Sequence, residues 1–106
     1  MSTSWIYLIG AVIFEVLGTT CMKLSAGFTK VVPSVLIFIS YGLCFTCMTL
    51  CLQKIEVSIA YSFWAGLGTT LIALIGIIFF HESASSIKLI SIALIIIGVI
   101  GLNAGK

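Results

Sequence analysis

Four apolar stretches take up almost the whole chain, and each is long enough to cross a lipid bilayer as a helix. They span about residues 4–22, 33–52, 58–80 and 87–103, and a membrane-spanning helix needs about 20 apolar residues. Because lipid offers no hydrogen bonds to the backbone, runs of this length are expected to be helical. The sequence therefore predicts an all-α membrane protein with four transmembrane helices.

The composition leaves no room for a separate soluble domain. Of the 106 residues, 61% are hydrophobic and 8% are charged, whereas a soluble domain carries about 25% charged residues. Residues 1–106 are therefore expected to form a single transmembrane domain. The first stretch lacks a basic leader and contains a glutamate, so we interpret it as a retained helix and not as a signal peptide. Short links place consecutive helices antiparallel, with both termini on the same side.

One acidic residue, Glu15, lies in the middle of the first stretch. At about 1.5 Å per residue it is roughly 15 Å from the membrane surface, near the centre of a ~30 Å hydrocarbon layer. A charged side chain at that depth costs about 3 kcal/mol even on lenient scales. We expect this carboxylate to take up a proton or to pair with a cation. The sequence thus predicts that Glu15 is a protonatable site for a cation.

Residues three or four positions from Glu15 share its face of the helix. Gly18 and Ala11 leave room beside the carboxylate, and Thr19 adds a hydroxyl group. Small residues also allow helices to pack closely in membranes, which is a structural alternative for Ala11 and Gly18. The residues expected to line a cavity with Glu15 are Leu8, Ala11, Val12, Gly18, Thr19 and, from the second stretch, Tyr41.

The third stretch supplies aromatic side chains and glycines. Tyr61, Trp64 and Gly68 fall on one helical stripe. A tyrosine offers a hydroxyl group to a carboxylate, and a tryptophan ring attracts a cation by ~1–2 kcal/mol when the pair is desolvated. The alternative is an aromatic belt at the membrane surface. Gly66 and Gly68 weaken the helix locally and predict a conformational bend there.

The fourth stretch is apolar on all sides and suits a contact between helices. Ser91, Leu94 and Gly98 lie on one stripe, where small residues allow a second helix to approach closely. A surface that faces lipid is the alternative. Four short helices are too few to enclose a sizeable cavity, so we expect at least a dimer, with Ser91, Leu94 and Gly98 at its contact.

The sequence contains no constellation that would indicate an enzyme. There is no nucleophile–base pair, no phosphate-binding glycine loop and no metal-ligand cluster, and neither a metal nor another cofactor is expected. Cys44, Cys47 and Cys51 share a helix face, but we interpret them as small, polarisable packing residues in preference to a soft-metal site. The net charge of +2 does not indicate binding to nucleic acid.

Several segments together resemble the small multidrug resistance transporters of bacteria. They are residues 14–23 (FEVLGTTCMK), 25–30 (SAGFTK), 33–34 (PS) and 59–68 (IAYSFWAGLG). The resemblance implies a multi-pass antiparallel homodimer in the bacterial inner membrane that exchanges protons for cationic substrates. It also implies that Glu15 binds either the proton or the cation, and that Tyr61 and Trp64 line the substrate site.

The sequence Gly18-Thr19-Thr20 resembles the members that export quaternary ammonium and polyaromatic cations, because guanidinium exporters typically have tryptophan at the position of Gly18. Expected partners are hydrophobic cationic small molecules, protons, membrane lipid and a second copy of the chain. Trp5, Ser58 and Ser91 depart from the familiar pattern. Three alternatives stay open: a guanidinium exporter, one half of a two-chain polyamine or lipid-phosphate-carrier exporter, and a structural membrane subunit.

The lysines are almost evenly divided between the two sides of the membrane. Lys54 and Lys106 lie on the side of the termini, and Lys23, Lys30 and Lys88 lie on the other side. Since lysines in short loops set orientation, this near balance predicts that copies insert both ways and pair antiparallel. Adding two lysines to the link at residues 53–56 should therefore fix one orientation and reduce activity. Cysteine accessibility on each side and transport in cells would measure both effects, and unchanged orientation and activity would contradict the hypothesis.

Overall fold

The computed structural model describes residues 3–105, which form four helices. These are α1 (Thr3–Leu24), α2 (Val31–Cys51), α3 (Val57–Phe79) and α4 (Ser86–Ala104), and no strand occurs within the described residues. By length and composition all four could cross a membrane. The predicted class, an all-α protein with four membrane spans, is confirmed. Each helix begins and ends within one or two residues of the expected bounds.

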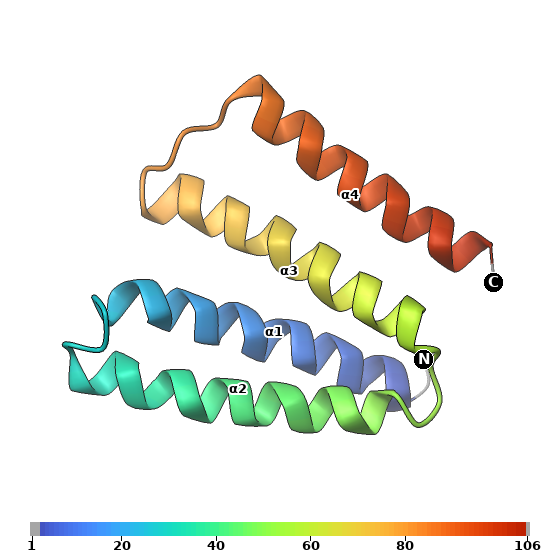
Figure 1. Cartoon of the computed structure of the whole chain (residues 1–106), viewed down its shortest axis with the longest axis horizontal. Coiled ribbons are helices and arrows are strands. Elements are labelled where there is room, and N and C mark those ends of the chain that lie inside the picture. Colours follow the sequence, from blue (N-terminus) through green and yellow to red (C-terminus); the bar gives the residue numbers. More distant parts are fainter. Residues whose placement is uncertain (1–2, 106) are drawn as a thin grey trace.

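The helices lie side by side in the order α2, α1, α3 and α4 (Figure 1). α1 packs along α2, α3 packs against α1, and α4 packs chiefly against α3. The result is a flat layer with extents of 43 × 35 × 19 Å. α1 begins and α4 ends at the same end of this layer, as predicted (Figure 1). Lys106, which the sequence places on that side, lies outside the described residues.

The short links are tied down by local hydrogen bonds. Between α1 and α2, the hydroxyl of the buried Ser25 donates to the carbonyl of Met22 and accepts from the amide of Phe28, at 2.9 and 3.2 Å. Before α4, the hydroxyl of Ser85 accepts from the amide of Lys88 at 3.2 Å and caps the helix. Such caps stabilise helix ends, and the links thereby hold neighbouring helices antiparallel.

The core of the chain lies among the first three helices. Its buried members are Leu8 and Ala11 from α1, Cys44, Met48 and Cys51 from α2, and Ala60 from α3. α4 has no buried residue, and Ser91, Leu94 and Gly98 are all exposed on it. These three residues are thus open to lipid or to a second chain, and their role in a dimer contact stays a prediction.

α3 runs without interruption through Gly66 and Gly68. Gly66 lies at the contact with α4, where a Cβ atom would fall 2.6 Å from Cγ2 of Val99. The absence of a side chain therefore lets α4 approach α3. The bend expected at these glycines stays a prediction, and the close helix contact at Gly66 is a separate reason for a glycine there.

Replacing Gly66 by alanine should weaken the contact between α3 and α4. The branched side chain of Val99 is stiff, so relieving the overlap should cost about 1–3 kcal/mol of unfolding free energy. Gly42→Ala is the matched control, because a Cβ on Gly42 meets nothing within 4 Å. Unfolding in mixed micelles with increasing dodecyl sulfate would measure both variants. Equal stability of Gly66→Ala and Gly42→Ala would contradict this packing.

Candidate functional site

The carboxylate of Glu15 lies against the backbone of α3 at Gly68. A Cβ atom on Gly68 would fall 2.5 Å from Oε2 of Glu15 and 3.1 Å from its Cδ atom. Any side chain at this position would therefore displace the carboxylate. Because Gly68 has no side chain, the carboxylate of Glu15 can lie directly against the backbone of α3. This is a second reason for a glycine here, in addition to the flexibility expected from the sequence.

Glu15 has no partner for one of its oxygens. The residue is half-buried, and its Oε2 atom is buried without a hydrogen-bond partner among the described residues. Leaving a buried acceptor unsatisfied costs about 1–3 kcal/mol, and more for a charged group. A proton or a cation at Oε2 would remove that cost.

Trp64 lies one helical turn before Gly68 on α3, so the two share a face. Its Nε1 atom is also buried without a hydrogen-bond partner among the residues that the structure covers. The thiol of Cys44 on α2 lies beside this N–H group, and sulfur is a weak acceptor, so the face of α3 toward Glu15 combines a close contact for the carboxylate with a weakly satisfied N–H donor. Buried polar groups without partners are rare in folded proteins and are often functional.

Aromatic rings continue from Trp64 in two directions. The Tyr61 ring lies edge-on at 5.4 Å between centroids, and Phe45 of α2 lies at 6.4 Å. Phe45 in turn lies 5.8 Å from Tyr41. Phe45 was not among the residues predicted from the sequence, although its position four residues after Tyr41 places it on the same face of α2. Tyr61 is 58% exposed, so this aromatic surface is open on one side.

Tyr41 joins α2 to α1 beside the acidic residue. Its ring lies on Gly18, where a Cβ atom would fall 2.5 Å from the ring, and its hydroxyl forms a hydrogen bond with the hydroxyl of Thr19. The structure thus brings together Gly18, Thr19 and Tyr41, one turn along α1 from Glu15. Both hydroxyl groups can serve as donor or acceptor.

Leu8, Ala11 and Val12 are buried in the single chain, as Gly18 also is. Their exposed fractions are 2%, 0% and 4%, because they pack in the interior of this chain. A cavity-lining role for them stays a prediction, and it requires the core of the single chain to open.

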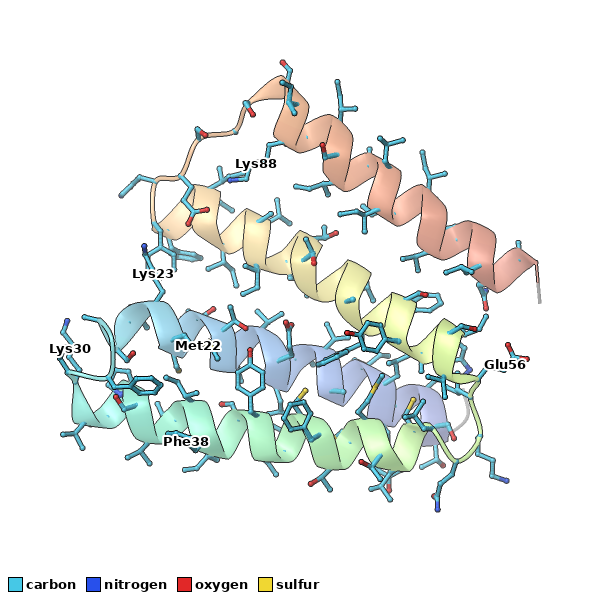
Figure 2. All side chains as sticks on the ribbon, viewed as in Figure 1. Met22, Lys23, Lys30, Phe38, Glu56 and Lys88 are labelled. Carbon is cyan, nitrogen blue, oxygen red and sulfur yellow. The ribbon has the colours of Figure 1, made fainter. Side chains whose placement is uncertain are left out.

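Among residues 3–105, no lysine accompanies Glu15 in the middle of the layer. The other charged side chains lie at the helix ends, as Figure 2 shows for Lys23, Lys30, Glu56 and Lys88. The one ion pair found among residues 3–105 joins Lys88 and Glu82. In the same range, no group of three or more His, Cys, Asp or Glu residues could hold a metal ion. The charge of Glu15 is therefore not balanced from within the described chain.

Four apolar helices of membrane-spanning length and an acidic group at the centre of the first define a multi-pass membrane protein. Residues 3–95 match the family described as Small Multidrug Resistance protein. The chain belongs to this family.

Relatives match along nearly the whole chain. An uncharacterized membrane protein of Bacillus subtilis strain 168, YvaE, is 50% identical over 94% of this chain and 84% of its own length. The quaternary ammonium compound-resistance protein QacC of Staphylococcus aureus is 43% identical over 93% of this chain and 92% of its own. The multidrug resistance protein EbrA of Bacillus licheniformis is 38% identical over 97% of this chain and 98% of its own length.

Replacing Gly68 by alanine should push the carboxylate of Glu15 away from α3 while leaving the fold intact. A hydrophobic carbodiimide, which reacts with carboxyl groups in apolar surroundings, would report the change as an altered rate of labelling at Glu15. Gly42→Ala should label like the parent chain, because the added Cβ meets nothing within 4 Å. Labelling of Gly68→Ala at the parent rate would show that Gly68 does not position this carboxylate.

Proposed function

We propose that the chain is a proton-coupled exporter of lipophilic or quaternary ammonium cations, in which Glu15 binds either the proton or the cation. The observation that carries this proposal is the buried Oε2 atom of Glu15, which has no hydrogen-bond partner among the described residues and lies against Gly68. The names of the relatives support the substrate class, since they describe resistance to quaternary ammonium compounds and to multiple drugs.

The proposed exchange follows from the electrostatics of an apolar layer. A charge pair is far stronger there than in water, so an ionised Glu15 attracts a lipophilic cation out of the membrane surface. The rings of Trp64 and Tyr61 then hold the cation and its apolar body. When a proton binds Glu15, the attraction disappears and the cargo is released. Because one carboxylate serves both ligands, proton entry and cation exit are coupled.

A second copy of the chain is part of the proposal. The single chain is a layer 19 Å thick, with Tyr61 exposed beside the site and no buried residue on α4. Two such layers in antiparallel orientation would enclose a cavity between two copies of Glu15. Halves with the same sequence but opposite orientation can exchange conformations, so that the cavity opens to either side at similar energy.

Gly18 favours bulky cations over guanidinium as cargo. The ring of Tyr41 already occupies the space beside Gly18, so a tryptophan at that position could not be accommodated without moving Tyr41. Because residue 18 is a glycine, the ring of Tyr41 lies directly on α1, one turn from Glu15, and forms an aromatic surface there. That surface suits large hydrophobic cations, which bind chiefly by apolar and cation–π contacts.

Replacing Glu15 by glutamine should preserve the fold and abolish transport driven by a pH gradient. The amide keeps the size of the side chain but can neither bind a proton nor attract a cation. Uptake of a labelled quaternary ammonium compound into proteoliposomes with an imposed pH gradient would measure this loss. Glu56→Gln is the matched control, because Glu56 is exposed at the start of α3. Persisting pH-driven transport by Glu15→Gln would disprove the proposal.

A further inference from the structure

A second carboxylate, that of Glu82, lies near the C-terminal end of α3, in the pocket between α3 and α1. It contacts Gly76 so closely that a Cβ atom there would overlap Oε1 of Glu82. Gly76 follows Gly68 by eight residues, which is about 12 Å along a helix. α3 therefore has two glycines against which a carboxylate lies, Gly68 under Glu15 near the middle and Gly76 under Glu82 near the helix end, about 80° apart around the helix axis.

The backbone after α3 holds Glu82 in this place. His81 has a φ of 58°, in the left-handed region, and turns the chain back over the end of the helix. The amide of Glu82 then donates to the carbonyl of Gly76 at 3.0 Å, as in the hydrogen bonding that ends many helices. Because this bond uses the backbone, the position of residue 82 does not depend on its side chain.

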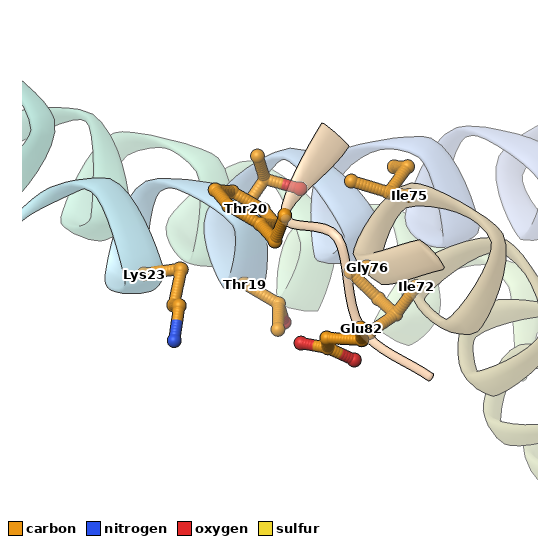
Figure 3. Close-up of a pocket in the computed structure, with 8 residues that line it drawn as sticks. Thr19, Thr20, Lys23, Ile72, Ile75, Gly76 and Glu82 are labelled. Carbon is orange, nitrogen blue, oxygen red and sulfur yellow. The ribbon is translucent and has the colours of Figure 1, made fainter. Parts of the chain in front are cut away.

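Glu82 lines a pocket of about 170 Å³ between α1 and α3. Figure 3 shows its carboxylate pointing toward the α1 side chains of Thr19 and Lys23. Thr19 lies one turn from Glu15 on α1, so the pocket is about one helical turn away from the Glu15 site. The remaining lining residues are Thr20, Ile72, Ile75, Gly76 and Phe80. Apolar walls beside a carboxylate suit an alkylammonium group with a hydrophobic body.

The charges around Glu82 make it a weak site. Nζ of Lys88 lies 3.5 Å from its Oε1 atom, with the two side chains 30% and 48% exposed, and Lys23 lines the same pocket. An exposed ion pair of this kind contributes only about 0–1 kcal/mol, so a passing cation can displace Lys88. A site on a transport path must bind well enough to be entered and weakly enough to be left.

We propose that Glu82 is a second, shallow binding group for the cationic head of the substrate, in the pocket between α1 and α3 that lies about one helical turn from the Glu15 site. The inference rests on the proposed transport function and extends it. Glu82 would receive quaternary ammonium groups at the membrane surface, while Lys23 and Lys88 act as tethered competing cations.

The test measures initial rates of proton-driven transport of benzyltrimethylammonium in proteoliposomes. Glu82→Gln should raise the concentration for half-maximal rate about two- to fivefold, the range expected for one exposed charge interaction. Lys88→Gln should lower it, because it removes a competing cation. Glu56→Gln should leave it unchanged. Equilibrium binding of a lipophilic cation and elution volume in detergent, unchanged in all three, would show that the variants fold.

The opposite directions of the two changes are what separate a cation site from a structural ion pair. If Glu82→Gln and Lys88→Gln shifted the concentration in the same direction, the pair would be structural and the inference would be wrong. It would also be wrong if Glu82→Gln had no effect. Glu15→Gln distinguishes the two proposals. If this variant still transports, the exporter proposal is wrong. If Glu15→Gln loses transport and Glu82→Gln leaves the half-maximal concentration unchanged, only the second site is wrong.

Discussion

The structure depends on one unbalanced charge in an apolar layer. Glu15 is brought to α3 by close packing at Gly68, and its buried oxygen finds no hydrogen-bond donor among the described residues. The lysines that could pair with it lie near the ends of the helices or in the links. A carboxylate in such a place gains free energy from any proton or cation that reaches it. In the proposed function, the aromatic surface of Trp64, Phe45 and Tyr41 would give that cation a place for its apolar part.

Much of the fold could be predicted from the sequence, because membrane spans are set by the length of apolar runs. The position of Glu15 within the first run also points to a candidate site from the sequence alone, and the role of that site stays a prediction. Helix packing was harder to predict, since it depends on how each helix rotates about its axis. Phe45 was missed for this reason, and so was the close approach of Glu15 to Gly68 and of Val99 to Gly66.

The same limit applies to residues that the sequence grouped by helical spacing. Gly18 and Thr19 do meet Tyr41 beside the acidic residue, whereas Leu8, Ala11 and Val12 are packed inside the single chain. Helical spacing predicts that residues share a face of α1. That face is broad enough for some of its residues to pack in the core of the chain while others lie near Glu15. On α4 the residues grouped by spacing are exposed instead of buried: no other part of the described chain covers Ser91, Leu94 and Gly98. In the proposed dimer these residues would meet their counterparts.

The most direct test of the central claim is equilibrium binding of tetraphenylphosphonium to the detergent-purified protein across a range of pH, with released protons recorded at the same time. If Glu15 holds either a proton or a cation, binding should be tight at high pH. It should weaken as the pH falls, and each bound cation should release protons where the carboxyl is protonated. Binding that is independent of pH and releases no protons would contradict competition at Glu15, and with it the proposed coupling.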